Sequence, residues 1–167
     1  DWAVNGCTGW SWREVLPFFL RSEGNQGLPA GPLHATDGPL PVTTPPGGDP
    51  LCDAVVAAAL QMGLPHNPDF NGPSQWGAGY YQHTLQAGRR ASAARAYLAR
   101  ARGRRNLTVW TGTAAQRLLF DGTRVCGVEV RRGSGPPQKV RAAREVLVCA
   151  GAVHSPQLLQ VSGIGPA

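Results

Sequence analysis

The sequence predicts an α/β fold with additional α+β elements, and three observations carry this prediction. Two segments, residues 11–21 and 50–62, begin with residues that favour the start of a helix. Residues 125–131, next to an Asp-Gly turn, alternate apolar and polar side chains, which is typical of antiparallel strands. Residues 146–149 are continuously apolar, which is the pattern of a strand buried on both faces of a parallel sheet.

The first predicted helix spans residues 11–21. Ser11 can cap its start, and Glu14 completes a capping box three residues later. Apolar side chains recur behind this cap at helical spacing. Pro17 lies beyond the first turn, so we expect it to kink or shorten the helix.

Two further helices are predicted from the residues at their ends. Asp49 is a favourable N-cap for the helix over residues 50–62, and Gly63 is a favourable stop. Ser92 can cap a third helix that extends to about Ala101.

Extended segments account for most of the remaining chain. Residues 24–48 are rich in Gly and Pro and predict a loop. The Asp121-Gly122 pair is a strong hairpin signal, and we expect a three-stranded antiparallel meander around it. The predicted extended segments and strands are 38–42, 80–85, 106–110, 114–120, 125–131 and 139–142.

Small residues after the predicted buried strand are the first indication of function. The strand over residues 145–149 runs into Ala150-Gly151-Ala152, and a helix is expected to start near Ser155-Pro156. Small side chains let a ligand approach the backbone, and ligands of open α/β sheets bind at strand ends, where helix N-termini favour anions such as a pyrophosphate. The segment fits a plain strand–turn–helix packing unit equally well, so the residues alone leave both interpretations open.

The net charge of +6 raises the question of an anionic partner. Seven arginines lie within residues 89–105, and Lys139 is the only lysine. Nucleic-acid surfaces interleave aromatic side chains with basic ones, but only Tyr97 does so here. We therefore expect a solvated basic surface and no nucleic-acid partner, and we leave membrane association and the oligomeric state open.

The cysteines and the hydropathy of the chain indicate in which cellular compartment the protein resides. The spacing of the cysteines predicts no zinc site and favours a reducing, cytoplasmic location. No run approaches the roughly 18–20 apolar residues that span a bilayer. The chain opens at Asp1 without an initiator methionine and ends in a loop-like stretch, so we expect an internal piece of a longer protein. The four cysteines are Cys7, Cys52, Cys126 and Cys149.

The stretch over residues 151–165 holds a dense set of special residue types. It contains Gly-Ala, then Ser-Pro, two aliphatic residues, and finally Ser-Gly-aliphatic-Gly, at Gly151, Ala152, Ser155, Pro156, Leu158, Leu159, Ser162, Gly163, Ile164 and Gly165. This pattern resembles the second signature of the glucose–methanol–choline (GMC) oxidoreductase family, and it is far more specific than a lone glycine motif.

Other segments are similar to the same family, in the same order along the chain. They are distributed over essentially the whole chain: 1–2, 9–12, 16–19, 38–42, 70–72, 77–81, 88–92, 96–98, 106–109 and 120–129. The similarity is to the alcohol and choline dehydrogenases of the family.

The resemblance implies FAD as the cofactor and hydride transfer from the CH–OH group of a small-molecule alcohol to the flavin. By position, it implies that the backbone of Ala115 meets the adenine and that Ala150 and Gly151 lie beside the dinucleotide. It further implies a partial Rossmann-like FAD-binding domain with the β-meander over residues 91–167. Residues 1–90 are expected to mix helical and loop segments of the FAD and substrate domains.

Several parts that catalysis in this family requires do not occur in the sequence. There is no Gly-x-Gly-x-x-Gly turn. None of the histidines, His34, His66, His83 and His154, fits the family's catalytic position, so we expect each to be structural or solvated and His154 to form a local hydrogen bond at a helix start. We expect this chain to be inactive alone; the alternatives are a non-catalytic, degraded family member that serves as a binding or scaffold protein, and a basic anion-binding module.

Overall fold

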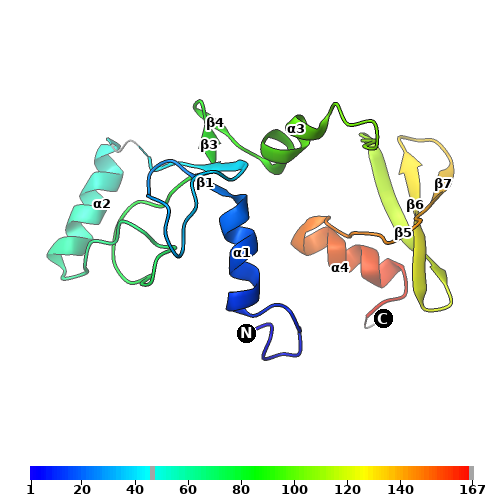
Figure 1. Ribbon diagram of the computed structural model, residues 1–167, viewed down its shortest axis with the longest axis horizontal. Coiled ribbons are helices and arrows are strands. Elements are labelled where there is room, and N and C mark those ends of the chain that lie inside the picture. Colours follow the sequence, from blue (N-terminus) through cyan, green and yellow to red (C-terminus); the bar gives the residue numbers. More distant parts are fainter. Residues whose placement is uncertain (46–47, 166–167) are drawn as a thin grey trace. The chain divides into compact units, whose positions relative to one another are not determined.

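Figure 1 shows the computed structural model, which describes residues 1–45 and 48–165. The chain divides into two units, Asp1–Leu107 and Thr108–Ala167. The predicted division after residue 90 assigns segments to the FAD and substrate domains, and it stays a prediction.

The first unit begins with helix α1 (Trp12–Ser22), whose start confirms the predicted capping box. Glu14 Oε2 accepts one hydrogen bond from the Ser11 backbone N–H, at 3.0 Å, and another from the Ser11 hydroxyl, at 2.5 Å. Pro17 lies inside the helix and does not shorten it. Proline removes one hydrogen bond of the helix but holds φ at a helical value, and the flanking turns sustain the helix here.

A short parallel pair of strands follows α1 and was not predicted in full. Strand β1 (Glu23–Asn25) pairs with β2 (Leu40–Val42), which lies in the predicted extended segment. A Cβ at Gly38 would collide with the carbonyl oxygen of Glu23. Glycine therefore lets the chain return alongside β1.

Helix α2 (Pro50–Gln61) confirms the second predicted helix. Asp49 Oδ1 accepts hydrogen bonds from the backbone N–H groups of Leu51 and Cys52, both at 3.0 Å. A hydrogen bond from the Tyr80 hydroxyl to Asp53 ties the helix to the later loop, and it raises the pKa of Tyr80 to about 12.

In the rest of the first unit, one prediction is wrong and another is confirmed. The expected strand over residues 80–85 is wrong, because the hairpin of β3 (Leu85–Gln86) and β4 (Arg89–Arg90) starts only at its last residue. Within residues 80–84 the backbone forms an isolated bridge between His83 and Thr43. The third predicted helix is confirmed, because residues 93–101 are helical directly after Ser92. Most of it is the π-helix η1 (Ala94–Leu98), followed by one turn of α-helix, α3 (Ala99–Ala101).

The second unit contains the predicted three-stranded meander. Strands β5 (Thr113–Asp121), β6 (Arg124–Arg132) and β7 (Pro137–Arg141) are antiparallel in the order β5-β6-β7. Leu118 and Val130 are its buried apolar side chains, at 5% and 8% exposed.

Two other predicted strands are wrong. Residues 106–110 and 145–149 form no strand, and Leu147 is 76% exposed. A strand needs the backbone of a neighbour to bond with, and no described residue provides one for either run. The helix after the second run, α4 (Gly151–Val161), starts at Gly151 and includes Pro156, whereas we expected it to start near Ser155.

None of the helices within residues 1–45 and 48–165 is long and apolar enough to cross a lipid bilayer.

Candidate functional site

Helix α4 begins at a glycine because of the backbone conformation there. Gly151 has φ +86°, in the left-handed region that glycine adopts without strain. The backbone N–H of Ala150 donates to the Ser155 hydroxyl at 3.0 Å, which fixes the turn into the helix. The predicted small residues therefore lie at the start of a helix, although the strand expected before them is absent.

The other end of α4 is fixed against the meander by residues of the same motif. The Ser162 hydroxyl donates to the carbonyl oxygen of Leu158 at 2.5 Å and accepts from the backbone N–H of Leu118 at 2.8 Å. The backbone N–H of Gly163 donates to the carbonyl oxygen of Gln160, and the backbone N–H of Ile164 donates to that of Leu159, both at 2.9 Å. These two bonds form a Schellman motif.

A hollow of about 480 Å³ lies between β5 and α4. Its lining includes two of the three predicted cofactor-binding residues, Ala115 and Ala150. The third, Gly151, adjoins Ala150 at the helix start but does not line the hollow. The lining residues are Ala114, Ala115, Gln116, Ala150, His154, Gln157, Leu158 and Val161.

Polar side chains and an irregular strand border this hollow. A register shift between Ala115 and Arg117 produces a β-bulge at Gln116, so the strand is irregular where it borders the hollow. Gln116, His154 and Gln157 supply polar groups to the lining. The sequence did not identify Gln116. No hydrogen bond of the His154 side chain is found within residues 1–45 and 48–165, so its expected local bond does not form there.

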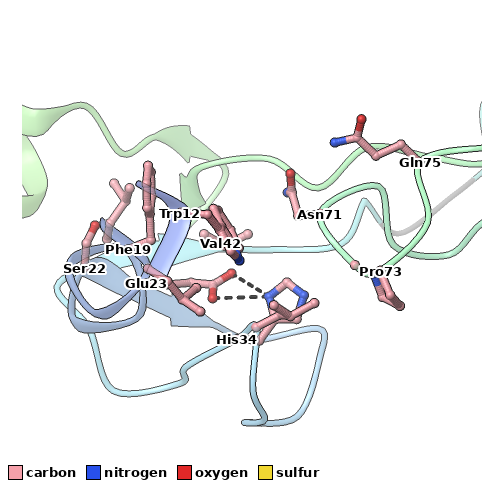
Figure 2. Close-up of a pocket in the computed structure, with 13 residues that line it drawn as sticks. Trp12, Phe19, Ser22, Glu23, His34, Val42, Asn71, Pro73 and Gln75 are labelled. Atoms are coloured by element: carbon pink, nitrogen blue, oxygen red, sulfur yellow. Dashed lines mark hydrogen bonds and ion pairs between the residues drawn. The ribbon is translucent and has the colours of Figure 1, made fainter. Parts of the chain in front are cut away.

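A second cavity, of about 1040 Å³, lies within the first unit. Figure 2 shows Trp12, Phe19 and Val42 on its wall, with Glu23 and His34 below them and Asn71, Pro73 and Gln75 from a later loop. The rings of Trp12 and Phe19 stack at 6.5 Å. One wall is therefore aromatic, and another carries charge.

The charge belongs to a cluster of Glu23, His34 and Asp69. His34 Nδ1 lies 3.0 Å from Glu23 Oε1, and His34 Nε2 lies 2.9 Å from Asp69 Oδ2. The His34 side chain is 10% exposed. Burial lowers the pKa of His34, but the hydrogen bonds and negative charges of Glu23 and Asp69 outweigh it, so the pKa is raised above 6.5.

The sequence offered no signal for this cluster. Its three members are far apart along the chain, and His34 lies in a loop rich in Gly and Pro, where we expected a structural or solvated role. Only the pairing of β1 with β2 and the fold of the later loop bring the three side chains together.

Two solved structures with a similar fold indicate the class of protein. Pyridoxine 4-oxidase from Mesorbium loti aligns with 96% of this chain at a TM-score of 0.82 and 39% identity, and this chain covers 31% of it. An FAD-dependent oxidoreductase from Chaetomium thermophilum aligns with 99% of this chain at a TM-score of 0.87 and 28% identity, and again 31% of that chain is covered. The fold is thus one found in oxidoreductases.

The profile of the GMC oxidoreductases matches residues 1–167, so the chain belongs to this family. The oxygen-dependent choline dehydrogenases of Yersinia pestis (strain Pestoides F) and Pseudomonas aeruginosa (strain UCBPP-PA14) are each 46% identical to it over 170 residues. That alignment covers 99% of this chain and 30% of either relative. The resemblance found in the sequence is confirmed, and the chain spans about a third of the length of the curated relatives it matches.

Proposed function

We propose that the chain is part of an FAD-dependent oxidoreductase that oxidises the CH–OH group of a small alcohol, of the choline or alcohol dehydrogenase type. The observation that carries the proposal is the 46% identity to choline dehydrogenases over 99% of this chain. FAD, when bound, would supply the acceptor for the hydride. The activity would belong to the complete protein, because this chain corresponds to 30% of those relatives.

Features of the hollow between β5 and α4 support placing a part of the cofactor there. Ala115 and Ala150 line it, and a Cβ built on Gly151 would meet no atom within 4 Å, so the start of α4 is open. We propose that the backbone at Ala115 contacts the adenine and that Ala150 and Gly151 lie beside the dinucleotide. The partial positive charge of a helix N-terminus would suit its phosphates.

We propose that this chain binds and orients, and that the proton of the alcohol is taken up elsewhere in the complete protein. His154 lies in the first turn of α4 and lines the hollow, so its position suits contact with the cofactor. We also propose that residues 91–167 belong to the FAD domain and that residues 1–90 mix FAD and substrate domains.

A reducing, cytoplasmic compartment is proposed from the cysteines. All four are free thiols, and Cys7, Cys52 and Cys149 are exposed. Exposed thiols persist in reducing compartments, whereas secreted proteins tend to pair them.

The test is the flavin content of the complete protein and of two variants. Purified protein should carry yellow flavin absorbance and bleach when an alcohol substrate such as choline is added without oxygen. Ala150→Phe should lower the bound flavin at least several-fold, because the new ring occupies the hollow. Ala143→Phe is the matched control, since Ala143 is exposed and does not line the hollow.

Two results would contradict the proposal. A colourless, folded complete protein that takes up no added FAD would favour a non-catalytic binding or scaffold role. Equal flavin content in Ala150→Phe and Ala143→Phe would move the cofactor away from this hollow while leaving the enzyme class intact.

A further inference from the structure

His34 bonds through both ring nitrogens to groups that only accept. Glu23 lies at Nδ1, 3.0 Å away, and Asp69 lies at Nε2, 2.9 Å away. An ionised carboxylate has no hydrogen to donate, so both bonds form together only when each ring nitrogen carries a proton. We propose that His34, held as an imidazolium between Glu23 and Asp69, is a pH-dependent clasp that fastens the segment 67–79 to β1 and so fixes one wall of the cavity in Figure 2.

Hydrogen bonds centred on Asn67 connect the two ends of the segment 67–79 to its middle. Asn67 is 7% exposed and donates from Nδ2 to the carbonyl oxygens of Ser74, at 2.9 Å, and Trp76, at 3.4 Å. Its backbone N–H donates to Ala78 O at 2.9 Å. The segment supplies Asn71, Gly72, Pro73 and Gln75 to the cavity wall. Loss of the contact between Asp69 and His34 would therefore alter the position of these wall residues.

Glu23 and Asp69, the two carboxylates of the clasp, differ in how many other hydrogen bonds hold them in place. Glu23 is held independently of His34, because its carboxylate accepts from Asn25 Nδ2 at 2.9 Å and from the Ala35 backbone N–H at 3.0 Å. Asp69 Oδ2 forms the hydrogen bond with His34, and among the described residues Asp69 Oδ1 accepts a hydrogen bond only from the nearby Asn71 backbone N–H. We therefore expect the hydrogen bond between His34 and Asp69 to break before the one between His34 and Glu23.

Loss of one proton from His34 would act on that weaker side. A neutral ring keeps a single N–H, which the firmly held Glu23 would retain at Nδ1. Nε2 would then direct a lone pair at Asp69 Oδ2, and two carboxylates would face a neutral ring. Glu23 of β1 and Asp69 of the segment 67–79 are the charged groups that face His34 in the described part of the chain.

The direction of the pH dependence follows from the raised pKa. The clasp stabilises the closed segment fully below the ordinary histidine value of 6.5, and its contribution is lost as the pH rises through the higher folded-state pKa of His34. Each unit by which the pKa is raised corresponds to about a tenfold change in the equilibrium between closed and released segment. This inference does not depend on the proposed flavin chemistry.

The test is hydrogen–deuterium exchange of peptides from residues 67–79 in the complete protein, measured from about pH 5.5 to 9 and corrected for the intrinsic exchange rate. We expect protection to fall by about tenfold per unit of raised pKa, in step with the ionisation of His34 followed by NMR of labelled histidine rings. Asp69→Asn should remove this step and keep the segment closed, because the new amide can donate to a neutral ring.

His66→Gln is the matched control, because His66 lies beside the same segment with an exposed side chain. It should keep the pH step. The proposal is overturned if the unsubstituted protein shows no step, if the step persists in Asp69→Asn, or if it disappears in His66→Gln. The titration of the unsubstituted protein decides the question even if Asp69→Asn does not fold, and neither outcome requires flavin to be bound.

Discussion

At the residue scale, Gly151 shows a glycine that is required by conformation alone. Its φ of +86° lies in the left-handed region, yet a Cβ there would meet no atom within 4 Å. If a larger residue at this position destabilises the protein, the reason must be the strain of its backbone in the left-handed region and not a steric collision. This separates Gly151 from Gly38, where a Cβ would collide with neighbouring backbone.

We predict that Gly151→Ala destabilises the start of α4 by about 1–2 kcal/mol, because an L-residue pays this amount in the left-handed region. Gly103→Ala is the matched control, since a Cβ at Gly103 also meets open space but no positive φ is found there. Thermal unfolding of the complete protein measures both. Equal melting temperatures for the two variants would contradict the conformational explanation.

The sequence could not predict the role of His34 at this scale. A histidine in a loop rich in Gly and Pro gives no local sign of its partners, and Glu23 and Asp69 reach it only through the fold. By contrast, Ala115 and Ala150 were predicted from the family resemblance, and the structure places both on one hollow. Whether the cofactor occupies that hollow stays a prediction.

At the element scale, α4 and β5 are joined through one hydroxyl. Ser162 donates to Leu158 O within its own helix and accepts from the backbone N–H of Leu118, a residue only 5% exposed. A buried N–H that loses its acceptor costs about 1–3 kcal/mol. Ser162 therefore positions the helix that lines the hollow.

We predict that Ser162→Ala accelerates exchange of the Leu118 amide by roughly ten- to hundredfold, which is what such a cost implies. Ser162→Thr should restore most of the protection because it keeps the hydroxyl. Ser134→Ala, at an exposed position in the turn between β6 and β7, should leave the amide unaffected. Unchanged exchange in Ser162→Ala would show that Leu118 does not depend on this hydroxyl.

Elements with local signals were predicted well, and those that need distant partners were not. The capping box at Ser11 and the cap at Asp49 act within a few residues, so the sequence predicts α1 and α2 correctly. The meander pairs neighbouring strands across short turns and was also predicted. The run 145–149 has the composition of a buried strand, but its state depends on neighbours that the sequence of the run does not contain.

At the scale of the whole molecule, the chain exposes more surface than a finished fold of its size. Its accessible surface is 12857 Å², whereas even two fully separate compact units of equal size and the same total mass would expose roughly 9,500 Å². Apolar side chains account for part of the excess: Val4 is 90% exposed, Met62 81% and Leu147 76%. The buried apolar residues in the described ranges are Ala91, Ala96, Leu118 and Val130.

We predict that residues 1–167 produced alone bind a hydrophobic dye and lack a single cooperative unfolding transition. The relatives that match this chain are about three times as long, and in the complete protein we expect the additional segments to cover the exposed apolar side chains. Dye fluorescence and calorimetry compare the two forms: the complete protein should bind little dye and unfold cooperatively. A monomeric, cooperatively unfolding product of residues 1–167 with no dye binding would contradict this account, because burial of so few apolar side chains cannot offset the conformational entropy of ordering the chain.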